Sequence, residues 1–109
     1  MGAWLSAFLV TQAIEVPIYW RALRGRPLGL ALALAFAASL ITHPLVWLGV
    51  PRLGLPYVPA VAVAEAFAIA AEALWLRAWR APHPLAWSVL ANAASASIGL
   101  ALRALVGWP

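Results

Sequence analysis

Glu15, Glu65 and Glu72 are the only acidic residues of the chain, and each lies within a long apolar stretch. A carboxylate at the centre of a bilayer costs about 2.5–3.5 kcal/mol on insertion scales, so such a group normally faces the interior of a helix bundle. Intramembrane carboxyl groups mark ion pathways and proton relays. The three glutamates therefore indicate where the chemistry of this chain takes place.

Glu15, Glu72 and Asn92 form the first expected site. Counting about 1.5 Å per residue from the expected helix ends places all three roughly 6–9 Å from the same membrane surface. Two carboxylates and an amide oxygen suit a hard cation, and a metal, if one binds, is expected on Glu15 and Glu72. Alternatively, the two carboxyl groups share one proton, because like charges repel in a medium of low dielectric constant. The competing interpretation is a structural network that joins helices.

Glu65 and His43 form a second, deeper set, which indicates a proton relay or a metal site. The competing interpretation is that His43 only packs between helices. Zinc usually takes three or four His, Cys or carboxylate ligands, and the chain contains no cysteine, so zinc is a minority interpretation. Arg103 either pairs with Glu65 or extends its guanidinium to the nearby membrane surface.

The elements that must position these groups are helices, because polar residues recur at spacings of three and four. Each helix then carries one polar stripe and is otherwise apolar. Turning the four stripes toward one another avoids unsatisfied polar groups in hydrocarbon. The supporting polar residues of the stripes are Gln12, Ser39, Thr42, Ser88, Ser95 and Arg103.

The composition predicts a membrane protein. Of the 109 residues, 66% are hydrophobic and 9% are charged, and the mean hydropathy is +0.94, which is more apolar surface than a soluble domain of this size can bury. The expected spans are 3–20, 28–50, 59–76 and 85–106, each near the ~20 residues that cross a bilayer. We expect an all-α fold, a single transmembrane domain in the form of a four-helix bundle.

The positive charges indicate topology rather than nucleic-acid binding. The net charge is +4, and five of the seven basic residues lie in the two loops on one side of the expected bundle. These are Arg21, Arg24, Arg26, Arg77 and Arg80. The positive-inside rule places these loops in the cytoplasm and both termini on the extracytoplasmic side. Tryptophans at both levels of helix ends agree with two interfacial belts. We therefore expect a multi-pass protein of a bacterial inner (plasma) membrane.

These observations lead to three hypotheses of function. The leading one is a small transporter or channel subunit for a cation or for protons, in contact with the lipid bilayer and forming a homo-oligomer. No cofactor is expected beyond a bound cation. The second is an accessory or assembly subunit of a larger membrane complex, which binds partner helices or lipid. The third is a small membrane enzyme acting on a lipid-like substrate. It would use Glu15 or Glu72 as general base and His43 as acid, and it ranks last because a depth gap of roughly 13–16 Å between these groups argues against direct cooperation.

Overall fold

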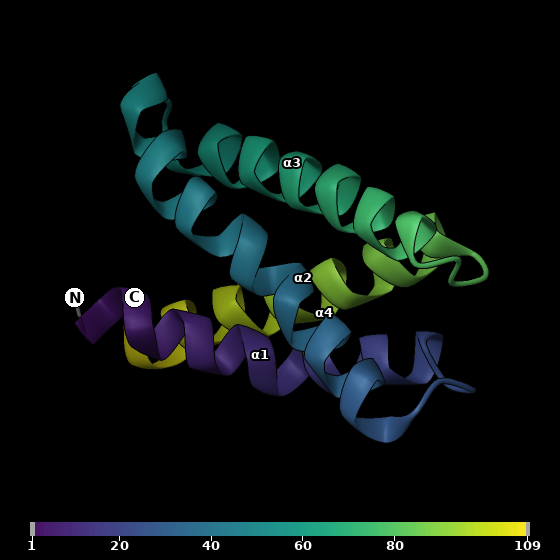
Figure 1. Cartoon of the computed structure of the whole chain (residues 1–109). Helices are drawn as coiled ribbons and strands as arrows, with labels where there is room; N and C mark the ends of the chain where they lie inside the picture. The colour runs from purple at the N-terminus through teal and green to yellow at the C-terminus, as the bar shows by residue number, and fades with distance from the viewer. Residues whose placement is uncertain (1, 109) are drawn as a thin grey trace.

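The computed structural model describes residues 2–108 and is built from four α-helices (Figure 1). The helices are α1 (Gly2–Ala22), α2 (Leu28–Gly49), α3 (Tyr57–Ala78) and α4 (Pro84–Val106), and a short 3-10 helix, η1 (Val50–Leu53), follows α2. The all-helical class and the four helices are confirmed. The observed bounds differ from the expected ones by at most two residues.

Proline, glycine and left-handed backbone define where helices begin and end. Pro84 is the first residue of α4, a position where its missing N–H removes no helical hydrogen bond. Gly107, with φ 66°, ends α4 in the left-handed conformation that favours glycine. Arg80, with φ 60°, does the same after α3, and the N–H of Ala81 returns to the carbonyl of Leu76 at 3.0 Å.

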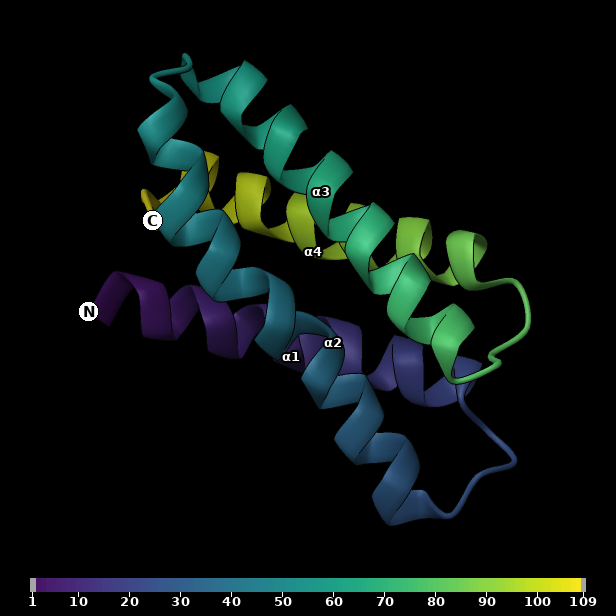
Figure 2. The same cartoon turned by 45° about the horizontal axis from the view of Figure 1, so that its top comes forward.

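Each helix packs against two neighbours. α1 and α3 each contact α2 and α4, whereas within residues 2–108 the diagonal pairs α1 with α3 and α2 with α4 have no close backbone approach. The ribbons of α2 and α3 diverge from those of α1 and α4 toward the end that carries both termini (Figure 1). α2 crosses α1 obliquely in both views (Figure 2). The four helices therefore form a ring that widens at the end with the termini.

The opposite end of the bundle is filled by an apolar core. Tyr19, Leu23 and Leu76 are fully buried there. Alanines of α2 and α4 let the helices approach closely, and they are Ala31, Ala35, Ala38 and Ala91. The core therefore closes the bundle beside the loops that carry most of the arginines.

The loop between α1 and α2 also touches the end of α3. The Arg26 guanidinium donates a hydrogen bond to the carbonyl of Trp79. Nearby, the indole N–H of Trp75 donates to the carbonyl of Leu34 at 3.0 Å. These bonds tie α2 and α3 together at the closed end.

The outside of the bundle is largely apolar. Large aliphatic side chains such as Val58, Leu74 and Leu105 are exposed. Three helical segments, Leu28–Leu53, Tyr57–Ala78 and Pro84–Val106, are long and apolar enough to cross a membrane. α1 is not among them by this measure, because Gln12, Glu15 and other polar side chains lower its hydropathy.

Candidate functional site

Glu72 lies at the centre of a buried hydrogen-bond network. Its side chain is 2% exposed and accepts hydrogen bonds from three other helices. Tyr19 Oη donates to Oε1 at 2.5 Å, Asn92 Nδ2 donates to the same oxygen at 3.1 Å, and Thr42 Oγ1 donates to Oε2 at 2.6 Å. Tyr19 belongs to α1, so its bond crosses the diagonal between two helices that do not pack directly.

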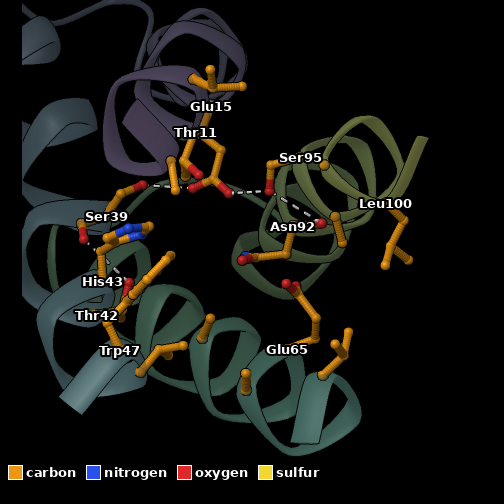
Figure 3. A pocket seen from close by; sticks show the side chains of 18 of the residues that line it. Thr11, Glu15, Ser39, Thr42, His43, Trp47, Glu65, Asn92, Ser95 and Leu100 are labelled. Atoms are coloured by element: carbon orange, nitrogen blue, oxygen red, sulfur yellow. Dashed lines mark hydrogen bonds between the residues drawn. The ribbon is translucent and has the colours of Figure 1, made fainter. Parts of the chain in front are cut away.

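Glu15 has a second set of hydroxyl donors. It is 1% exposed, and Ser39 Oγ donates to Oε1 while Ser95 Oγ donates to Oε2, both at 2.6 Å. Ser95 Oγ also lies 3.2 Å from the carbonyl of Asn92, which connects Glu15 to the partners of Glu72 (Figure 3). Both oxygens of each buried carboxyl group therefore accept hydrogen bonds, and the network spans all four helices.

Two further polar residues bond to backbone. Ser88 Oγ donates to the carbonyl of Ile69 at 2.8 Å, and the carbonyl of Ser88 accepts from Asn92 Nδ2 at 2.9 Å. Gln12 Nε2 donates to the carbonyl of Phe36 at 3.0 Å, and Gln12 Oε1 is buried without a partner. Ser88 therefore orients Asn92, while Gln12 joins α1 to α2.

A cavity of about 350 Å³ extends from this network toward the end of the bundle that carries the termini. Glu15, Glu72 and Asn92 line its deep end, and His43 and Glu65 line its middle. Figure 3 shows Glu15, His43, Glu65 and Asn92 pointing toward one space from four different helices. At the mouth the lining residues are Trp47, Tyr57, Arg103 and Trp108.

His43 and Glu65 share the cavity but no hydrogen bond joins them within residues 2–108. Nε2 of His43 and Oε2 of Glu65 are both buried without a partner. The His43 ring lies among aromatic rings, with centroid distances of 5.3 Å to Phe8 and 5.8 Å to Trp4. Two polar atoms are thus available to a ligand in the middle of the cavity.

Arg103 lies at the mouth of the cavity and contacts an aromatic ring there. Its guanidinium carbon lies 4.1 Å from the centroid of the Tyr57 ring. This is a cation–π contact, in which the face of the Tyr57 ring attracts the positive charge of Arg103. Within residues 2–108 Arg103 forms no ion pair with Glu65, and Oε2 of Glu65 has no hydrogen-bond partner.

The structure brings Glu15, Glu72 and Asn92 into one network, and it adds two residues that depth counting had placed elsewhere. Counting about 1.5 Å per residue from the helix ends puts Ser39 near the midplane and Thr42 in the outer half, whereas in the structure they donate to Glu15 and Glu72. Depth counting assumes helices that are parallel and flush at their ends. α2 crosses its neighbours obliquely (Figure 2). Its middle turns can therefore reach both carboxyl groups, as the hydrogen bonds from Ser39 and Thr42 show.

The sequence interpretation placed Tyr19 on the polar face of the first helix but did not include it among the site residues. The available signal was spacing, since Tyr19 follows Glu15 by four residues and so shares its helix face. The aromatic mouth formed with Trp47, Tyr57 and Trp108 was also missed. Aromatic residues at helix ends are equally typical of a membrane interface, so the sequence offered no signal for that role.

Within the described residues, no group of three or more histidine or acidic side chains is arranged to hold a metal ion. No protein-family model, curated protein or solved structure matches the chain. The chemistry must therefore be inferred from the site alone. Paired buried carboxyl groups at the end of a cavity can bind a positive charge, and they can hold and release protons.

Proposed function

We propose that this chain is an integral membrane protein that binds a cation in the cavity and releases protons in exchange. The observation that supports this most is the pair Glu15 and Glu72, two almost fully buried carboxyl groups at the deep end of one cavity. Packing alone would be served by a serine, threonine or asparagine at lower cost in a membrane.

The membrane setting follows from the three long apolar helices and from the apolar exterior. α1 would complete the bundle, with its polar face turned to the network and its apolar face to lipid. The positive-inside rule then places the closed, arginine-rich end in the cytoplasm and the cavity mouth on the opposite side.

Exchange for protons follows from the charges that face the cavity. They are Glu15 on α1, His43 on α2, Glu65 and Glu72 on α3, and Arg103 on α4. A proton and a cation compete for the same carboxyl group, because protonation removes the negative charge that the cation needs. Binding of the cation should therefore release protons and should strengthen as the pH rises.

Flux measurements in proteoliposomes test this proposal. Vesicles containing the purified protein and a pH-sensitive dye are given an inward gradient of K⁺, Na⁺ or a small organic ammonium ion. We expect outward proton movement that falls roughly tenfold or more in Glu15→Gln and in Glu72→Gln, in line with about 1.4 kcal/mol per factor of ten. Ser97→Ala, a substitution on an exposed face of α4, is the control. Unchanged flux in both glutamine variants for every cation would refute the proposal.

A further inference from the structure

The cavity is larger than a bare inorganic ion requires. At about 350 Å³ it falls within the range of pockets that hold small organic molecules, roughly 300–1,000 Å³. A calcium ion, by contrast, needs six to eight oxygen ligands at about 2.3–2.6 Å. Within residues 2–108 no cluster of histidine or acidic residues meets even the minimum for a metal ion. The size and the lining therefore favour an organic ligand.

The lining changes in character along the cavity. Carboxyl groups lie at the deep end, and the walls between them and the mouth are formed mainly by short apolar side chains. These wall residues are Ala7, Val10, Val46, Val61, Ala64, Ala68, Ala96, Gly99 and Leu100. Beyond them, Trp47, Tyr57 and Trp108 stand at the mouth. The complementary ligand has a positively charged head and an apolar body.

Small residues on the cavity walls leave the space between the diverging helices unfilled. A side chain added at Gly99 would point into open space, because no heavy atom lies within 4 Å of the position of its Cβ. Gly99 lines the cavity from α4, opposite Ala64 and Ala68 of α3. Glycine in the middle of a helix is less favourable than alanine, so helix formation alone does not favour it there.

Polar atoms in the middle of the cavity also lack partners. Oε2 of Glu65 and Nε2 of His43 are buried without a hydrogen-bond partner, and both residues point into the same space as Glu15 (Figure 3). A carboxylate oxygen and an unbonded ring nitrogen can accept hydrogen bonds from the N–H groups of an amine. At the mouth, the indole rings of Trp47 and Trp108 can attract the same charge, whereas the Tyr57 ring is in contact with Arg103.

From these observations, and resting on the proposed function, we propose that the cation bound in this cavity is an organic ammonium ion with an apolar body. Its charged head lies near Glu15 and Glu72, with Glu65 beside it. Its apolar body lies against the alanine and valine walls, near Trp47 and Tyr57.

Binding to the full chain in lipid nanodiscs tests the charge requirement. The probes are 2-phenylethylammonium, whose N–H groups can donate hydrogen bonds, and its uncharged analogue 2-phenylethanol, measured by isothermal titration calorimetry. We expect the ammonium probe to bind at least roughly tenfold more tightly, which corresponds to about 1.4 kcal/mol, because the carboxyl groups at the deep end attract its charged head more strongly than the hydroxyl group of the neutral probe. In Glu72→Gln this preference should shrink. Equal affinity for the two probes in the native chain would overturn the inference.

A second variant tests the location and the size. Gly99→Leu should narrow the cavity and weaken binding of 2-phenylethylammonium at least roughly tenfold, whereas Gly29→Leu, at an exposed glycine of α2, should leave binding unchanged. Circular dichroism and thermal unfolding of both variants establish that they fold. Binding to a folded Gly99→Leu chain with native affinity would place the probe elsewhere and overturn the inference.

The outcomes for the two proposals are distinct. Glutamate-dependent flux of Na⁺ or K⁺ without binding of the ammonium probe would overturn the inference and leave the proposed function intact. Absence of glutamate-dependent flux for both inorganic and organic cations would overturn both.

Discussion

The hydrogen bond between Tyr19 and Glu72 gives a quantitative test of the network. Tyr19 Oη donates to Glu72 Oε1 at 2.5 Å across the diagonal of the bundle, and Tyr19 is fully buried. Hydrogen bonds between transmembrane helices average about 0.6 kcal/mol and reach about 1.7 kcal/mol. At 2.5 Å this bond is short, so we expect a coupling free energy toward the upper end of that range, above about 1 kcal/mol.

A double-mutant cycle of Tyr19→Phe and Glu72→Leu isolates this coupling, because each substitution removes one partner of the bond. Reversible unfolding by sodium dodecyl sulfate in mixed micelles, followed by circular dichroism, gives the four free energies of unfolding. The control cycle replaces Tyr19→Phe with Tyr57→Phe, since Tyr57 lies at the cavity mouth and keeps its ring beneath Arg103. The control coupling should stay within about 0.5 kcal/mol. A Tyr19 coupling no larger than the control would refute the network as described.

Two further predictions concern single residues and their matched controls. Ser95→Ala removes a donor to Glu15 and should lower the free energy of unfolding by about 0.6–1.7 kcal/mol, whereas Ser97→Ala on the exposed face should change it by less than about 0.5 kcal/mol. Chemical unfolding of both alanine variants decides this, and equal effects would contradict it. Arg80→Gly should raise the free energy of unfolding by about 0.5–1 kcal/mol, because Arg80 holds a left-handed backbone, whereas Arg77→Gly within α3 should lower it by about 1 kcal/mol. Thermal unfolding midpoints that shift in the same direction for these two glycine variants would contradict the assignment.

The helices were predictable because their signals are local. Each apolar stretch is about as long as a membrane span and is bounded by proline, glycine or arginine, as in the segment from Gly49 to Pro59. The start of α3 was placed two residues late, at Pro59. A proline in the first turn of a helix costs no hydrogen bond, so the helix begins before it, at Tyr57.

The membership of the network was only partly predictable. The spacing of Glu15 on α1 and of Glu72 on α3 placed both on inward faces, but the partners from α2 depend on how that helix crosses its neighbours. The crossing is governed by close packing of Ala31, Ala35 and Ala38, which are all buried. Crossing angles depend on how the surfaces of two helices fit together, so they cannot be derived from the periodicity of polar residues along each helix.

The cavity was outside the reach of sequence reasoning for a related reason. Its volume results from the divergence of α2 and α3 from the other two helices (Figure 1). Small residues such as Ala68 and Gly99 are compatible with tight helix packing and with an empty space alike. Only the arrangement of the helices distinguishes the two outcomes.

Four of the five donors around the two buried glutamates are hydroxyl groups, from Tyr19, Ser39, Thr42 and Ser95. A hydroxyl group rotates about its C–O bond and serves as donor or acceptor, whereas a backbone N–H can only donate. The same heavy-atom positions therefore satisfy Glu15 and Glu72 with or without a proton, after reorientation of hydrogens alone. The site can change its charge without repacking the helices around it. Infrared bands of the carboxyl groups would then report its occupancy where the positions of the heavy atoms do not.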